Sequence, residues 1–365
     1  MTTLAASGAG SLAAALATEG PRVVEFAVAG VIDLGGRSIT IRQPNLTLAG
    51  ETAPSPGITL TNGGMNIVTH DVIVRHIRVR PGAGHRAKKS GWEIDSLATA
   101  GAHDVIVDHC SLTWGTDENL SASGPRFQGR TADEWRRNTS HRITFSHCIV
   151  GEGLHDSTHA KGPHSMGSLI HDNASDIAIF GNLYISNNAR NPLFKGGARG
   201  AVVNNVIHNP GNRLVTYGLV PQEWEGHDWQ RGIMVIAGNV GRKGASTTAD
   251  LEFFEVRGPC DAWLNDNLFF DATGAALPVK SRARDAKSGA VTSSPEAGLR
   301  VLDRQPFWPP RLKTRPAGET AAWVFANAGA RPWERDSIDQ RLIDEAKTGR
   351  GKIIHFESEV GGLGN

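Results

Sequence analysis

Residues 105–113 read VIVDHCSLT, and this strand-like kernel recurs at 72–80 as VIVRHIRVR and at 143–151 as ITFSHCIVG. Each copy alternates β-branched residues with other side chains and is bounded by Gly, Asn, Asp, Ser or Pro, which is the pattern of a short β-strand. Recurrence at a spacing of roughly 20–50 residues is typical of a repeat protein. Shorter copies follow at 177–185, 202–209, 235–241 and 263–269.

The spacing of the kernels identifies the kind of repeat. Aligned copies are separated by 33, 38, 34, 23, 34 and 28 residues. Helical repeats do not fit, because the kernels alternate with a period of two, and a β-propeller needs four strands per blade at a near-constant period. A constant strand with variable insertions predicts an all-β protein built as a parallel β-helix, in which coils stack and insertions emerge as loops.

One column of the alignment holds four asparagines, Asn182, Asn205, Asn239 and Asn267. Equivalent residues of stacked parallel strands lie about 4.8 Å apart, so each side chain can hydrogen-bond to the next, as in other stacked Asn arrays. Asn is also common in turns, but four asparagines in register favour a buried ladder.

Cysteine and histidine occupy the earlier copies of the same region. Cys110 and Cys148 fall in the asparagine column one coil apart, where a disulfide is sterically allowed, but we expect two buried free thiols. The histidines that precede this column (His76, His109 and His147) are interpreted as packed, hydrogen-bonded turn residues rather than metal ligands.

The two ends of the chain depart from the repeat. The Ala-rich segment 9–18 predicts a short amphipathic helix that caps the open end of the stack. The kernel disappears beyond about residue 280, and 336–348 is predicted to be helical. We therefore expect one domain over 1–365, with the β-helix at about 20–280 and a C-terminal extension, about 281–365, packed on it.

Composition excludes several classes of protein. The 365 residues include 38 basic and 37 acidic ones, and a net charge of +1 argues against a dedicated nucleic-acid binder. No apolar run approaches the roughly 20 residues of a membrane span, so no membrane partner is expected. The N-terminal segment 1–20 lacks the basic and apolar regions of a signal peptide. A mature exported protein would look the same, so the compartment stays open at this point.

Carboxylates gather between successive kernels. Glu93 and Asp95 have the spacing that points both side chains to one face of an extended strand, and Asp117 and Glu118 follow the next kernel. Stacking would bring these acids from adjacent coils to one flank. Several converging carboxylates without matching cations favour a hard cation such as Ca²⁺, although each acid alone would be a solvated loop residue.

Basic residues follow the acids along the chain. The segment GLHDSTHAKGPHSMGS at 153–168 contains Lys161 and His164. Gly and Pro break any helix that would align its histidines for zinc, so a loop that presents His and Lys to a polyanion is favoured. The loop NNARNPLFKGG at 187–197 adds Arg190 and Lys195.

These residues carry a family resemblance. The sequence resembles the pectate lyases of polysaccharide lyase family 1, which are right-handed parallel β-helix enzymes. The resemblance implies β-elimination of polygalacturonate or pectin, with Ca²⁺ as cofactor, by a secreted or periplasmic carbon–oxygen lyase that acts as a monomer. The resembling stretches keep their order: GSLAAAL at 10–16, LTLAGETAPSPGITL at 46–60, VDHCSLTWGTDENLS at 107–121, HAKGPHSMGS at 159–168, ARNPLFKGGARGAVVNNVIHN at 189–209 and ANAGARPWERDSIDQRL at 326–342.

The resemblance assigns the acids to a calcium site. Glu93 and Asp95 match the family's paired calcium acids, and Asp117 matches the acid after the DHC kernel. A further acid of the family falls on Ser121, which is a departure from the pattern. Glu118 is the candidate that substitutes for it; otherwise the site has fewer protein ligands.

The basic residues take the catalytic and substrate-binding roles. Arg190 matches the arginine that acts as base in the family. Lys161 matches a lysine that binds substrate, and we expect Lys161 and Arg190 to form the catalytic set together. Lys195 stands where many members have a second arginine, so it keeps the charge but loses the planar fork. The reaction removes the proton on C5 of a galacturonate unit. Positively charged groups are needed beside that sugar, because negative charge develops on it as the proton leaves.

Two questions stay open at this stage. His164 and Trp224 are candidate substrate-binding residues, but a tryptophan in the insertion 221–231 could equally pin its loop to the stack. The alternative functions are a β-helical polygalacturonase, which would need two or three acids at the scissile bond, and a non-catalytic pectin-binding β-helix. A calcium-dependent cleft is expected to favour unesterified chains.

Overall fold

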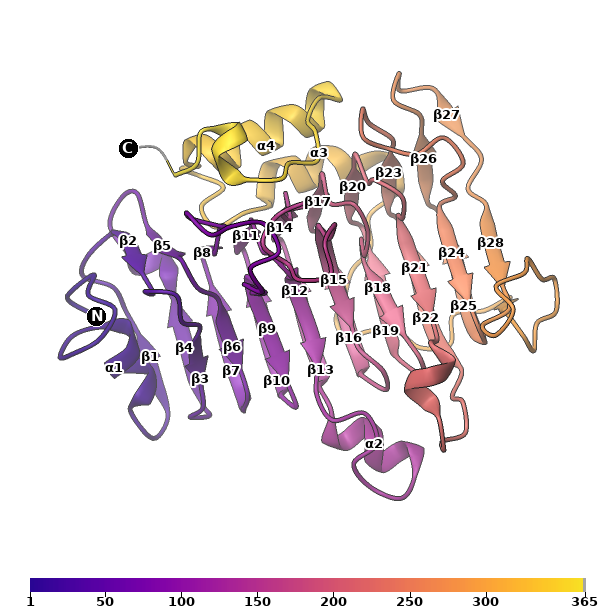
Figure 1. Ribbon diagram of the computed structural model, residues 1–365, viewed down its shortest axis with the longest axis horizontal. Helices are drawn as coiled ribbons and strands as arrows, with labels where there is room; N and C mark the ends of the chain where they lie inside the picture. Colours follow the sequence, from indigo (N-terminus) through magenta and orange to yellow (C-terminus); the bar gives the residue numbers. More distant parts are fainter. Residues whose placement is uncertain (364–365) are drawn as a thin grey trace.

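The computed structural model describes residues 1–363 and shows three sheets that run side by side along one long stack (Figure 1). Sheet A has the order β1 (Arg22–Val24), β4 (Leu46–Ala49), β7 (His70–Arg75), β10 (His103–Asp108), β13 (His141–Ser146), β16 (Ser175–Phe180), β19 (Arg199–Val203), β22 (Gly232–Ala237), β25 (Cys260–Asn265) and β29 (Leu299–Val301). Sheet B has the order β2 (Gly30–Asp33), β5 (Ile58–Thr61), β8 (Ile77–Arg80), β11 (Ser111–Thr113), β14 (Ile149–Gly151), β17 (Leu183–Ile185), β20 (Val206–His208), β23 (Val240–Arg242), β26 (Leu268–Phe270) and β27 (Ala276–Leu277). Sheet C has the order β28 (Ser281–Arg284), β24 (Phe254–Arg257), β21 (Val215–Gly218), β18 (Leu193–Lys195), β15 (Met166–Ile170), β12 (Glu118–Ser123), β9 (Leu97–Ala100), β6 (Met65–Ile67) and β3 (Ile39–Ile41).

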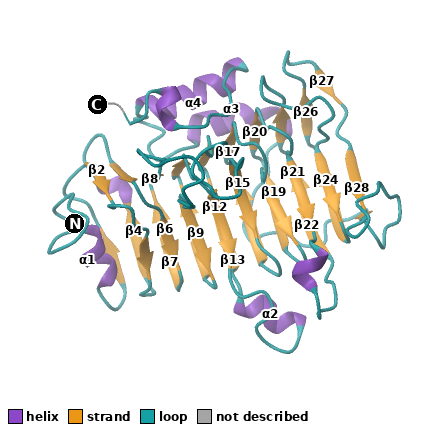
Figure 2. Ribbon diagram, in the orientation of Figure 1, coloured by secondary structure: helices purple, strands orange, loops and turns teal. Residues whose placement is uncertain are grey.

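Neighbouring strands in each sheet come from successive coils and pair in parallel, apart from the antiparallel contact of β27 with β26. This arrangement confirms the predicted parallel β-helix. Helices lie only at the periphery of the stack (Figure 2). They are α1 (Leu12–Ala17), α2 (Ala132–Asn138), α3 (Ala317–Asn327) and α4 (Ser337–Thr348), with short 3₁₀ turns at η1 (Gly50–Thr52), η2 (Pro221–Trp224) and η3 (Glu357–Val360). Among residues 1–363, no helix combines the length and apolarity that crossing a membrane requires.

Each recurring kernel forms two strands joined by a sharp corner. In the kernel 105–113, β10 ends at Asp108, His109 takes a left-handed backbone conformation with φ 50°, and β11 begins at Ser111. Within β10, Val105 and Val107 point into the core, whereas Ile106 between them is 39% exposed. The period-two pattern therefore encodes one buried and one outer face, and the turn residue redirects the chain from sheet A to sheet B.

The asparagine column is a continuous hydrogen-bonded ladder, as predicted. The side chain of Asn182 donates to Asn205 Oδ1, Asn205 donates to Asn239 Oδ1, and Asn239 donates to Asn267 Oδ1, each over 3.0 Å. Asn182, Asn205 and Asn239 have no exposed surface. Because a buried amide is costly unless it is paired, the ladder holds the coils in register.

The cysteines extend this column as free thiols. Cys110 and Cys148 are both buried, and the Cys110 backbone N–H lies 3.4 Å from Cys148 Sγ. Burial raises the pKa of the Cys148 thiol. The predicted stacked thiols are therefore present.

The open end of the stack is capped as expected. The side chain of Ser11 accepts a hydrogen bond from the Ala14 N–H and starts α1, whose Leu12 and Leu16 are buried in the core. At the other end the strands continue beyond residue 280, where the kernel had ended: β28 and β29 pair in parallel with β24 and β25. Their sequences, SRAR and LRV, lack the apolar alternation of earlier strands.

The C-terminal segment folds back over sheet B, where α3 and α4 lie side by side (Figure 1). Val324 of α3 and Leu342 of α4 join the buried cluster that contains Ile149 and Leu183 of sheet B. Buried charges strengthen the contact. Asp339 of α4 accepts hydrogen bonds from Arg80 over 2.7 Å and from Ser111 over 2.6 Å.

Candidate active site

A row of charged residues lies where four neighbouring strands of sheet C begin. The strands are β9, β12, β15 and β18, which come from four successive coils. We call this group the N-terminal row; it consists of Asp95, Asp117, Glu118, His164 and Arg190. The stack therefore brings together residues that are up to 95 positions apart in the sequence.

Three carboxylates of the N-terminal row converge. One oxygen from each of Asp95, Asp117 and Glu118 lies within 4.8 Å of the others. Leu97 pairs with Leu120 in the register of β9 and β12, and the Glu118 N–H donates to Asp95 Oδ1 over 3.0 Å. Burial, together with the charge of Asp117, raises the pKa of Asp95 to about 7.

Two of these three acids have basic partners. Glu118 forms an ion pair with Arg190, and Asp117 Oδ1 lies 2.7 Å from His164 Nε2. Although burial acts to raise it, the hydrogen bond from His164 holds the pKa of Asp117 below its usual range. Within residues 1–363, Asp95 has no ion pair. A cluster of hard oxygen donors with one uncompensated carboxylate fits a divalent cation such as Ca²⁺.

The backbone fixes the position of Arg190. Arg190 takes a left-handed conformation with φ 59°, and its carbonyl oxygen accepts a hydrogen bond from the Ser168 N–H over 2.6 Å. This close approach requires Gly167, because a Cβ atom there would lie 2.4 Å from the Arg190 carbonyl oxygen. Burial lowers the pKa of the Arg190 guanidinium, which increases its neutral fraction.

A second asparagine ladder lies directly behind the N-terminal row. Asn187 accepts hydrogen bonds from Asn119 Nδ2 and the Gly153 N–H, and it donates to Val150 O and Asn191 Oδ1, all over 3.0–3.1 Å. Asn119 follows Glu118, and Asn191 follows Arg190. The ladder thus ties the two members of the ion pair to one scaffold. This ladder was not predicted, because Asn187 follows β17 whereas Asn119 lies in β12 and Asn191 precedes β18.

Two predicted residues lie beside the row. Glu93 does not join the three carboxylates; its Oε1 accepts a hydrogen bond from the Ala160 N–H and lies 3.5 Å from His159 Nδ1. Lys161 is exposed on the same loop, and its backbone N–H donates to His159 Nδ1 over 3.2 Å. Within residues 1–363 no ion pair involves Lys161.

Lys195 belongs to a separate charged group at the opposite ends of the strands of sheet C, where β12, β15, β18 and β21 end. We call it the C-terminal row; it consists of Arg126, Asp172, Lys195 and Glu223. Lys195 is 8% exposed and forms ion pairs with Glu223 and, over 3.3 Å, with Asp172. The predicted substrate-binding lysine is therefore already paired, because acids from the loops after β15 and β21 fold onto it.

Trp224, a candidate substrate-binding residue that could equally have pinned its loop, is buried. Its ring is 1% exposed, and its Nε1 donates to Asp172 Oδ1 over 2.7 Å. Gly196 packs against the indole so closely that a Cβ atom would lie 2.4 Å from Nε1. No face of this ring is open to a sugar, and Trp224 instead pins its loop to the stack.

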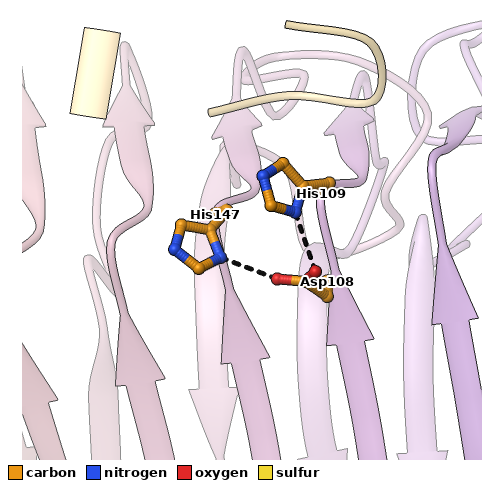
Figure 3. Close-up of side chains that lie close together, drawn as sticks. All are labelled: Asp108, His109 and His147. Carbon is orange, nitrogen blue, oxygen red and sulfur yellow. Dashed lines mark hydrogen bonds and ion pairs between the residues drawn. The ribbon is translucent and has the colours of Figure 1, made fainter. Parts of the chain in front are cut away.

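Another cluster of titratable side chains lies at the corner between sheets A and B (Figure 3). Asp108 accepts hydrogen bonds from Nδ1 of His109 and of His147, both over 2.7 Å. The two imidazoles stack with a centroid distance of 4.5 Å, and His76 stacks on His109. Both Nδ1 atoms are occupied by one carboxylate, which agrees with the interpretation of these histidines as hydrogen-bonded turn residues.

Known proteins resemble the chain over its whole length, although no protein-family model matches it. A probable pectate lyase C of Neosartorya fischeri is 30% identical, over all of this chain and 76% of that protein. The probable pectate lyase C of Emericella nidulans is also 30% identical, over all of this chain and 75% of that protein. The crystal structure of Jun a 1, the major cedar pollen allergen, has the same fold, with a TM-score of 0.55 and 11% identity over 90% of this chain and 87% of that chain.

The parallel β-helix and these full-length relatives define the class of the protein as a polysaccharide lyase. The chain belongs to the pectate lyase family.

Proposed function

We propose that the protein is a secreted, monomeric pectate lyase that requires calcium and cleaves polygalacturonate by β-elimination. The observation that supports this most directly is the N-terminal row, in which three carboxylates converge beside the partly buried Arg190. A hydrolase needs acids that face the scissile bond across a water or sugar, whereas here the acids are packed against one another.

Asp95, Asp117 and Glu118 would hold the calcium ion. Their oxygens are the hard donors that Ca²⁺ prefers. Burial and the charge of Asp117 raise the pKa of Asp95, and a cation among the three acids counteracts both effects by favouring the charged carboxylate. When bound, the ion supplies positive charge for the substrate carboxylate at the reacting sugar. His164 orients Asp117 instead of binding substrate, because its Nε2 already forms a hydrogen bond with the Asp117 carboxylate.

Arg190 removes the C5 proton of a galacturonate unit. The C5–H electron pair becomes the C4–C5 double bond, the C4–O bond breaks, and the departing glycosidic oxygen takes a proton from water to become a hydroxyl. Arg190 then returns the proton that it took from C5 to the solvent. A general base must be positioned at the proton that it abstracts and must be neutral when it acts. The backbone contact with Ser168 fixes the position of the Arg190 main chain.

Lys161 compensates the charge that develops on the substrate. Its side chain is exposed and unpaired within residues 1–363, on the loop that also carries His164. Lys195 contacts the carboxylate of a sugar further along the chain, at the other end of β18.

The activity is tested with polygalacturonate at alkaline pH by following the ultraviolet absorbance of the unsaturated product. Calcium should support the reaction, EDTA should abolish it, and Arg190→Ala should lower kcat on the order of a thousandfold, the range of a lost general base. Arg142→Ala is the matched control, because Arg142 also has a left-handed backbone and pairs with an acid, Asp104, but lies on sheet A.

Calcium binding has its own readout. Calorimetric titration of the EDTA-stripped protein should show one site that Asp95→Ala weakens and Glu93→Ala changes little. Reducing ends without ultraviolet absorbance would identify a hydrolase, and pectin binding without turnover would identify a non-catalytic protein; either result overturns the proposal.

A further inference from the structure

The C-terminal row holds equal numbers of cations and carboxylates. Arg126 lies 3.2 Å from Asp172 Oδ2 and 3.4 Å from Glu223 Oε1. Lys195 pairs with the same two acids. The two basic side chains are therefore neutralised before any substrate arrives, although Lys195 occupies a position at which the family resemblance implies a cation for the substrate.

The two acids of this row are held very differently. Asp172 has no exposed surface; its carboxylate accepts a hydrogen bond from the indole N–H of Trp224, and its backbone N–H donates to His171 Nδ1 over 2.9 Å. Glu223 is 32% exposed and belongs to the four-residue turn η2, which folds back after β21. Glu223 is thus the acid that can move aside.

A galacturonate carboxylate that approaches Lys195 must compete with Glu223 for the same ammonium group. A methyl-esterified sugar carries no charge at this position and gains nothing from displacing the glutamate. Since a charged group that already has a partner attracts a second anion less strongly, the pairing reduces the advantage of a free carboxylate over an ester.

We infer that Glu223 is a specificity-determining residue: it acts as an internal competitor for Lys195 and lowers the preference of this subsite for unesterified galacturonate. The inference rests on the proposed function and adds to it, because the calcium site in the N-terminal row favours a free carboxylate whereas the subsite at Lys195 tolerates an ester. Glu223 does not touch the reacting atoms.

The test compares the wild type with Glu223→Gln on unesterified polygalacturonate and on highly methyl-esterified pectin at fixed ionic strength. Removing the competing charge should raise kcat/KM on polygalacturonate on the order of fivefold, the effect of one partly screened charge pair, mainly through a lower KM. The value on esterified pectin should stay unchanged. Glu225→Gln is the matched control, because Glu225 is exposed on the same loop and has no ion pair within residues 1–363.

A second measurement separates charge from structure. In a Lys195→Met background the effect of Glu223→Gln should vanish, and the melting temperatures show whether each variant is folded. Equal changes on both substrates, or a gain that persists without Lys195, would overturn the inference.

Calorimetric titration with trigalacturonate provides a readout that does not need turnover. Glu223→Gln should bind trigalacturonate more tightly than the wild type, and unchanged affinity would overturn the inference. A wild type that binds trigalacturonate but forms no unsaturated product would overturn the proposed function alone.

Discussion

Replacing Asn187 with alanine should impair both stability and catalysis. Its side chain has no exposed surface and makes four hydrogen bonds of 3.0–3.1 Å. Each buried polar group that loses its hydrogen-bond partner lowers the free energy of unfolding by about 1–3 kcal/mol. Water that enters the space left by the side chain forms some of these hydrogen bonds and recovers part of the loss. We expect a loss of about 3 kcal/mol in the free energy of unfolding, measured by equilibrium urea denaturation with an unchanged m-value.

The catalytic effect follows from what this ladder holds. Asn119 and Asn191 are the neighbours of Glu118 and Arg190 in the sequence, so loss of Asn187 loosens the ion pair on both sides. A shift of about 1 Å at a catalytic group lowers the rate on the order of a hundredfold. Asn187→Ala should therefore lower kcat for unsaturated-product formation by a factor between roughly 10 and 100, at a temperature where the variant is fully folded.

Asn205→Ala is the control, because Asn205 is equally buried in the other asparagine ladder and accepts two hydrogen bonds from Asn182. It should cost a similar free energy of unfolding and leave kcat near the wild-type value. Equal kcat losses in the two variants, or destabilisation below about 1 kcal/mol in both, would refute the argument, since either result means that the ladders do not act as described.

Three further predictions concern single positions. Gly167→Ala should lower kcat at least tenfold in the same assay, because its Cβ meets a backbone carbonyl that has little room to move; wild-type kcat would contradict this. Asp339→Ala should destabilise the protein to urea by about 3–5 kcal/mol, since it leaves buried arginines under-compensated; a loss below about 1 kcal/mol would show that the contact is dispensable. Burial lowers the pKa of His208 to about 4. The unfolded chain therefore binds more protons between pH 4 and about 6.5, and the free energy of unfolding should rise with pH there by up to about 3 kcal/mol. His208→Gln should flatten that rise, and an unchanged slope would rule out His208 as its source.

The repeat and its consequences were predictable from the sequence because they depend on residues that recur at equivalent positions. The alternation of Val105, Ile106 and Val107 identifies a strand with one buried face, and four asparagines in register predict the ladder. These are local patterns repeated by a regular fold. The strands at 281–284 and 299–301 were missed because neighbouring coils impose their conformation without an apolar pattern of their own.

The candidate site was predictable only in part, since the direction and partners of a side chain depend on loops that the repeat does not specify. Spacing predicted that the acids share one flank, and one oxygen each of Asp95, Asp117 and Glu118 converges there. Glu93 lies beside them, but its carboxylate accepts a hydrogen bond from the Ala160 N–H instead of joining this cluster. Lys195 was predicted to bind substrate, but its ion pairs were not foreseen. Its partners Asp172 and Glu223 come from other coils, and no spacing rule relates them to it.

The two charged rows lie at opposite ends of the same short strands, and β18, between Arg190 and Lys195, contributes only three residues. The acids and the arginine lie where the strands begin. The groups proposed to set the preference for free or methyl-esterified galacturonate lie where the strands end. Exchanging the loops that follow these strands among relatives would therefore change the preference for esterified pectin and leave the reaction centre intact. Directed evolution of substrate preference should begin with these loops.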